Sequence, residues 1–128
     1  MVKSFVIDGK AYNVLVTSLT RSFEITEAIG KKITQSGGVY RDLVGTYYHY
    51  QMTVMAKSED RDGLDSFWED ISKPVNNHVC EFPYNQETLS QTMYVESGAQ
   101  SLSCIKDDGN VWDEITIYFY AQKPKVIP

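Results

Sequence analysis

The fold is decided around residues 40–52, which read YRDLVGTYYHYQM. From Thr46 to Ala56 the side chains alternate in character, which predicts a long central strand. One face of this strand carries Tyr48, Tyr50, Met52 and Val54, and the other carries Tyr47, His49, Gln51 and Thr53. We expect the first face to lie in the core and the second to be amphipathic.

Tyrosine is the most informative residue type in the composition, with nine among 128 residues. Its side chain is large and stiff, with an apolar ring and one polar group, and it is typical of protein contact surfaces. No catalytic partners accompany these tyrosines in the sequence. The pattern therefore favours assembly over chemistry.

The segment before this strand is rich in glycine and locally basic. It contains Lys31, Lys32, Gly37 and Gly38 within a protein whose formal net charge is −5. The alternation lapses here, which predicts a long Gly-rich loop over about residues 27–45. Long inserts in compact domains are more often functional than passive. The loop is either a surface hairpin tip or an arm that reaches a neighbouring subunit.

The N-terminal residues predict a hairpin, with strands at 4–7 and 12–17 around the turn Asp8-Gly9-Lys10. An Asp-Gly pair between β-branched runs is a strong hairpin signal, because glycine tolerates the positive φ that a tight turn requires. Residues 19–26 predict a third strand, in which Phe23 and Ile25 alternate with polar residues.

A helix is predicted from about Asp60 to Ser72, because the period changes after residue 58. Its apolar residues recur at helical spacing: Leu64, Phe67, Trp68 and Ile71. Acidic and hydroxyl side chains at its start are candidate caps, and Lys73-Pro74 ends it.

Four more strands are predicted at residues 77–83, 90–96, 100–105 and 111–121, separated by turn residues. In the last one Ile115, Ile117, Phe119 and Ala121 share one face, and Trp112, Thr116, Tyr118 and Tyr120 share the other. Many strands with one helix predict a mainly β fold, an antiparallel β-sandwich or partly closed barrel with one flanking α-helix. We expect residues 1–128 to form a single β-rich domain, with a loose C-terminal tail over about 122–128.

Composition argues against several function classes. The net charge of −5 and a pI near 4.9 disfavour attraction to nucleic acid. No run approaches the roughly 18 apolar residues of a membrane span, and the N-terminus does not resemble a signal peptide. We expect synthesis in a cytoplasm, with Cys80 and Cys104 both reduced.

Few residues suggest chemistry. His78 and Cys80 would share a strand face, so a zinc or redox site is conceivable, as is a Cys nucleophile with a His base. Neither histidine falls in an HExxH motif, and the acids near residue 60 lack the spacing of a calcium loop. We therefore expect no catalytic residue, metal or cofactor, and interpret His78 and Cys80 as packed strand residues.

The segments RDLVGTYYHY (41–50), ISKPVNNH (71–78) and WDEITIYF (112–119) resemble small tail-region structural proteins of phages and prophages of Gram-positive bacteria. So do the opening IDG (7–9) and SLTRSFEI (18–25). The resemblance implies a virion component of a long flexible tail, in the tube or the baseplate, made in the host bacterial cytoplasm. It implies β-sandwich subunits that assemble as rings, with a hexamer favoured, and a lumen that is often negatively charged. Other tail proteins would be its partners, DNA an unbound passenger, and the membrane no partner.

The leading hypothesis is a non-enzymatic structural protein that self-associates into a ring. A ring needs heterologous contacts, and we expect the loop and the Tyr-rich strands to supply them. The candidate contact residues are Lys31, Lys32, Gly37, Gly38, Tyr40, Arg41, Tyr47, Trp112, Tyr118 and Tyr120. The alternative is a carbohydrate-binding β-sandwich for cell-surface glycans, with Tyr47, Trp112, Tyr118 and Tyr120 as the stacking platform.

Overall fold

The computed structural model describes residues 5–33 and 35–128, which are mainly β. The elements are β1 (Val6–Ile7), β2 (Val14–Ile33), β3 (Val39–Ala56), α1 (Asp62–Ile71), β4 (His78–Tyr84), β5 (Glu87–Tyr94), β6 (Leu102–Lys106), β7 (Gly109–Trp112) and β8 (Ile115–Ala121). Six strands form an antiparallel sheet in the order β1-β4-β5-β8-β3-β2, and β6 and β7 form a separate hairpin. The described strands do not close into a barrel, so the expected mainly β, sandwich-like class with one flanking helix is confirmed.

The core lies between the inner face of β3 and β8 and the elements that cover it, α1 and the β4–β5 hairpin. Tyr50, Met52 and Val54 of β3 are buried, as predicted. In β8 the predicted alternation is also confirmed, because its inward residues are buried and Tyr118 is exposed. The Tyr50 hydroxyl donates a hydrogen bond to the Pro83 carbonyl at 3.0 Å, so the buried phenol is satisfied.

The predicted loop over residues 27–45 is wrong, because both of its flanks are strands. β2 and β3 pair from Val14↔Ala56 out to Ile33↔Val39 and leave only a short turn between them. The register shifts between Thr26 and Glu27 and again between Glu27 and Lys31. Across the first shift β2 advances by one residue and β3 by two, and across the second they advance by four and by two. Unpaired residues therefore interrupt the period-2 pattern while the pairing continues.

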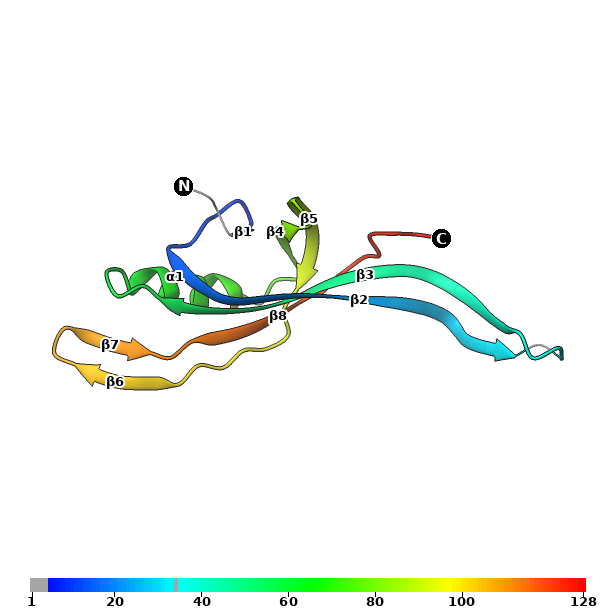
Figure 1. Cartoon of the computed structure of the whole chain (residues 1–128). Helices are drawn as coiled ribbons and strands as arrows, with labels where there is room; N and C mark the ends of the chain where they lie inside the picture. Colours follow the sequence, from blue (N-terminus) through cyan, green and yellow to red (C-terminus); the bar gives the residue numbers. More distant parts are fainter. Residues whose placement is uncertain (1–4, 34) are drawn as a thin grey trace.

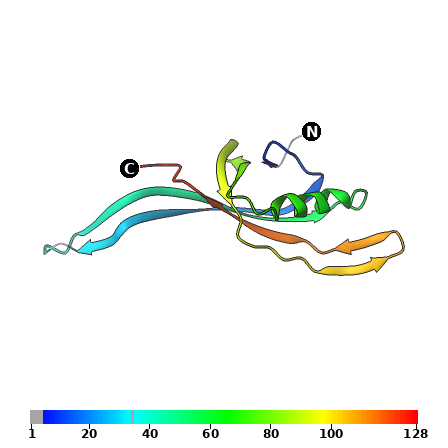
Figure 2. The ribbon, with the colours of Figure 1, turned by 180° about the vertical axis from the view of Figure 1, so that it is seen from behind.

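This pairing makes an arm, defined here as residues 22–49. The strand β8 pairs with β3 only at Tyr50–Val54, so the arm lies beyond the six-stranded part of the sheet. Figures 1 and 2 show it projecting from one end of the molecule, with α1 and the β6–β7 hairpin toward the opposite end. The molecule is therefore elongated.

The N-terminal turn is confirmed, but the hairpin predicted around it is wrong. Asp8 and Gly9 both have positive φ, and Ile7 and Lys10 bridge across them as in a type I′ turn. However, β1 pairs with β4, while β2 pairs with β3. The Asp8 carboxylate accepts the Val79 amide at 2.8 Å, which attaches the turn to β4. The residues predicted as a third strand, 19–26, continue β2.

The helix α1 falls inside its predicted range and buries Leu64, Phe67 and Ile71 against the sheet. The Asp60 carboxylate accepts the Asp62 amide at 3.1 Å, so an acidic side chain does satisfy one free N–H group at the helix start. Trp68, which shares the predicted stripe, is 36% exposed.

Two further predictions need correction. The strand predicted over 111–121 is interrupted at residues 113–114, so Trp112 belongs to β7 and pairs with Leu102. The C-terminal tail is docked on its own chain, because the Thr46 amide donates to the Val126 carbonyl at 2.8 Å and the Lys125 amide to the Thr46 carbonyl at 2.9 Å. Gly45 permits this approach, since a Cβ there would lie 2.7 Å from the Val126 oxygen.

Candidate subunit-contact surface

An aromatic stripe crosses three strands on the sheet face opposite the core. It consists of Tyr47 and His49 from β3, Tyr118 and Tyr120 from β8, and Tyr94 from β5. The register Gln51↔Tyr118 and the pair Tyr94↔Tyr120 place these side chains on one face. The rings follow one another at centroid distances of 6.3 Å (Tyr47–His49), 5.7 Å (His49–Tyr120), 5.4 Å (Tyr94–Tyr120) and 6.5 Å (Tyr118–Tyr120).

The rings of the stripe pack against one another and are partly open to solvent. The Ala121 amide donates a hydrogen bond to Nδ1 of His49 at an N···N distance of 3.0 Å, which fixes the His49 ring between the tyrosines. Tyr118 is 49% exposed, while Tyr47 and Tyr120 are half-buried. The fold thus brings together three predicted contact residues: Tyr47, Tyr118 and Tyr120. Preordered aromatic side chains lose little conformational freedom on binding, which suits them to a contact surface.

The sequence prediction did not include His49 and Tyr94 among the contact residues. For His49 a signal was present, because it alternates with Tyr47 on the outer face of the predicted strand. For Tyr94 there was none, since its position beside Tyr120 depends on the pairing of β5 with β8.

The opposite face of the arm carries apolar side chains with no cover. Phe23 pairs with Tyr48 and continues the inward face of the sheet, yet Phe23 is 68% exposed and Ile25 is also exposed. The cover ends nearby, because the Tyr48 ring lies 5.5 Å from that of Tyr84, the last residue of β4. Beyond that point the core face of the sheet meets solvent.

The predicted basic contact residues lie at the end of the arm. Gly37 has a φ of +88°, a left-handed conformation that glycine adopts without strain, and Gly38 follows it in the turn. The Arg41 side chain forms an ion pair with Glu27. The backbones of Lys31 and Lys32 pair with Arg41 and Tyr40, but the side chains of Lys31, Lys32 and Tyr40 lie outside the described residues.

Trp112 lies apart from the stripe, toward the other end of the molecule. It lines a groove of about 340 Å³ together with Asp65, Trp68 and Glu69 of α1 and Gln100 of the β5–β6 connection. The tryptophan therefore belongs with the helix surface.

His78 and Cys80 are both buried, as expected for packed strand residues. Burial raises the pKa of the Cys80 thiol to about 12, which keeps it protonated and weakly nucleophilic at neutral pH. His78 Nδ1 lies 2.7 Å from an Asp8 carboxylate oxygen. Burial alone would raise the pKa of Asp8, but the hydrogen bonds with His78 and the Val79 amide, together with electrostatic attraction to His78, outweigh it and hold the pKa below its usual value. Cys104 is an exposed free thiol.

Within residues 5–33 and 35–128 no group of three or more His, Cys, Asp or Glu side chains is arranged to hold a metal ion. In the same part of the chain no helix has the length and apolar character to cross a membrane.

The surface features that stand out are thus the aromatic stripe, the uncovered apolar face of the arm and the groove beside Trp112. All three offer large side chains to another molecule. No protein-family model matches the sequence, and no curated protein matches it.

Proposed function

We propose that this protein is a non-enzymatic structural subunit of a phage tail, in the tube or baseplate, that works by self-association into a ring. The observation that carries the proposal is the arm, a paired β-ribbon that projects from the body and exposes Phe23 and Ile25 (Figure 1). Apolar side chains on a projecting ribbon gain stability only when another surface covers them.

The backbone of the arm supports the same proposal. β2 has 20 residues and lies at one end of the strand order, so its outer edge carries a long row of N–H and C=O groups. Such an edge is a template for pairing with another chain unless it is blunted. Pairing would supply backbone hydrogen bonds, and the aromatic stripe on the adjoining face would supply specificity.

The proposed assembly is heterologous, with one surface of a subunit against a different surface of the next. The arm and the body are such a pair of different surfaces. The resemblance of the sequence to tail-region proteins favours a hexameric ring, in a virion tail, with other tail proteins as neighbours and DNA as an unbound passenger.

The direct test is an arm-shortened variant. Thr26 and Gly45 are cross-strand partners, so residues 27–44 can be replaced by Asn-Gly, which closes a two-residue turn. The replacement removes the outer part of the arm, and the same variant carries Phe23→Ser and Ile25→Ser, which removes the exposed apolar side chains that remain. The core and the tail contact at Thr46 stay in place. Sedimentation velocity and electron microscopy of concentrated protein should show rings or oligomers for the full chain and a folded monomer for the variant. A full chain that stays monomeric at every concentration, or a shortened chain that assembles equally well, would refute the proposal.

A carbohydrate-binding function is the second candidate, and the aromatic stripe supports it, because sugar rings stack on exposed aromatic faces. Tyr118 is the most accessible residue of the stripe. Titration with host cell-wall polysaccharide, alongside a glycan array, separates the two candidates. Binding that is lost in Tyr118→Ala, while Tyr118→Phe retains it, would favour the carbohydrate function; absence of binding to any glycan would remove it.

A further inference from the structure

The two ends of the molecule carry opposite charge. Residues 28–41, at the end of the arm, contain Lys31, Lys32 and Arg41 and no acidic residue. Glu27, just outside this range, forms an ion pair with Arg41, so Lys31 and Lys32 carry the net positive charge of this end. Residues 57–73 and 102–114, which form α1 with its flanks and the β6–β7 hairpin, contain ten acidic and four basic residues. Figures 1 and 2 both place these two regions at opposite ends of the elongated chain. The acidic chain therefore has one basic end and one strongly acidic end.

The acidic end contains a groove suited to a cation. Asp65 and Glu69 are one helical turn apart on the exposed side of α1, where like charges repel each other. Glu69 also lies in the last turn of the helix, where the dipole disfavours an anion, and that turn has no basic residue. Within the described part of the chain, neither carboxylate forms an ion pair. By contrast, Asp70 is bound by Lys10 and Lys73.

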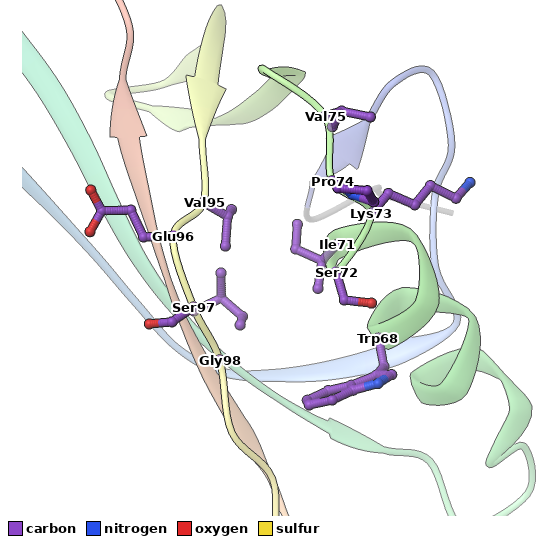
Figure 3. A pocket seen from close by; sticks show the side chains of 11 residues that line it. Trp68, Ile71, Ser72, Lys73, Pro74, Val75, Val95, Glu96, Ser97 and Gly98 are labelled. Atoms are coloured by element: carbon purple, nitrogen blue, oxygen red, sulfur yellow. The ribbon is translucent and has the colours of Figure 1, made fainter.

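The walls of this groove are aromatic. Trp68 and Trp112 line it and are 36% and 38% exposed. Trp68 also borders an adjoining cavity of about 270 Å³, in which Figure 3 shows Ile71 and Val95 pointing toward each other and Lys73 and Glu96 pointing outward. The surface thus combines carboxylates, two indole faces and an apolar recess. A Lys or Arg placed over an indole in such a setting gains cation–π attraction as well as charge pairing.

The end of the arm has the complementary chemistry. Its basic residues are accompanied by Val39, which is 63% exposed. We infer that the end of the arm of one copy, residues 28–41, docks in the groove of a second copy formed by Asp65, Trp68, Glu69, Gln100 and Trp112. The inference rests on the proposed self-association and names its two surfaces. Because the surfaces lie at opposite ends, each subunit can use one surface with each of two neighbours, and the contact repeats from copy to copy.

Charge reversal tests the docking directly. The groove variant carries Asp65→Lys and Glu69→Lys, and the arm variant carries Lys31→Glu and Lys32→Glu. The matched control makes the same two reversals elsewhere, Glu81→Lys and Glu87→Lys on β4 and β5. Circular dichroism and urea unfolding establish that each variant is folded, and Asp65→Asn with Glu69→Gln serves as a gentler groove variant. Sedimentation velocity at low and high salt then measures self-association.

We expect the groove variant and the arm variant each to weaken self-association about tenfold or more, and the control to resemble the unaltered chain. A 1:1 mixture of the two variants should assemble again, because each reversed surface meets an opposite charge. The attraction should also weaken as salt rises. If the unaltered chain assembles and either variant does so equally well, or if the mixture fails to assemble, the docking inference is overturned while self-association stands. If the unaltered chain never assembles, the proposed function fails as well.

Discussion

Two phenylalanines lie on the same face of the sheet, and their substitution by alanine should affect different properties of the protein, stability in one case and self-association in the other. Phe82 is fully buried, and its ring lies 4.7 Å from that of Tyr50 and 5.0 Å from that of Phe119. Phe23 belongs to the arm and is mostly exposed. We predict that Phe82→Ala destabilises the fold with self-association impaired only as a consequence, whereas Phe23→Ala weakens self-association and leaves the fold intact.

The magnitudes follow from burial. Truncating a buried phenylalanine costs about 3–5 kcal/mol, a large part of the roughly 5–15 kcal/mol that stabilises a domain. An aromatic side chain buries about 150–250 Å², so covering the 68% of Phe23 that is exposed would remove roughly 100–170 Å² from water. At about 25 cal/mol per Å² this contributes about 3 kcal/mol, and ordering the side chain costs about 1 kcal/mol. The net loss of about 2 kcal/mol of binding free energy corresponds to an increase of about 30-fold in the dissociation constant.

Two measurements separate the effects. Urea unfolding followed by tryptophan fluorescence gives the free energy of unfolding, which should change by less than about 0.5 kcal/mol in Phe23→Ala. Sedimentation equilibrium gives the dissociation constant of self-association. If Phe23→Ala assembles with the affinity of the unaltered chain, the apolar face of the arm is not part of the contact. If instead it unfolds as readily as Phe82→Ala, the arm belongs to the cooperative core.

Three further outcomes are expected. Tyr12 and Lys10 donate hydrogen bonds to the Asp70 carboxylate and hold its pKa well below the usual range. The ionised Asp70 therefore contributes stability above about pH 4, and this contribution is lost as pH falls toward the lowered pKa. Tyr12→Phe should cost about 1–2 kcal/mol at pH 7 and flatten the acid limb in urea titrations from pH 7 to 2. Gly45→Ala should detach the tail and raise exchange of the Thr46 amide about tenfold or more, measured by hydrogen–deuterium exchange. At pH 8 a thiol reagent should modify Cys104 within minutes and leave Cys80 unmodified until the protein unfolds; equal rates would contradict the burial argument.

The sequence predicts those parts of the fold that local patterns specify. The inward faces of β3 and β8, the type I′ turn at Asp8-Gly9 and α1 each follow from a period or a turn dipeptide within a few residues. Strand partners do not follow in the same way. β1 pairs with β4, and the Asp8 carboxylate accepts a hydrogen bond from the Val79 amide beside this pairing. A contact between residues 71 positions apart leaves no local pattern in the sequence.

The sequence of the arm predicts a loop because its strands stay paired where the alternating pattern of side chains is lost. The register shifts at Thr26/Glu27 and again at Glu27/Lys31, so unpaired residues interrupt the alternation while the strands remain paired. Glycines at 30, 37 and 38 add a composition that usually marks loops. Two strands that pair irregularly and contain glycine therefore have a sequence that resembles a loop. In the structure only the turn before Val39 separates these strands.

The contact surface depends on where the elements that cover the sheet end. The alternation of apolar and polar residues along a strand does not contain this information. Phe23 and Tyr50 lie on the same face, because Arg21 pairs with Tyr50 and Phe23 with Tyr48. Tyr50 is buried only because β4 passes over it as far as Tyr84, and Phe23 is exposed because β4 turns back there into β5. The length of β4–β5 relative to β2–β3 thus decides which apolar residues stabilise the chain and which are left for another molecule. On this reasoning, extending the β4–β5 hairpin with further alternating residues should bury Phe23 within the chain and abolish its contribution to self-association.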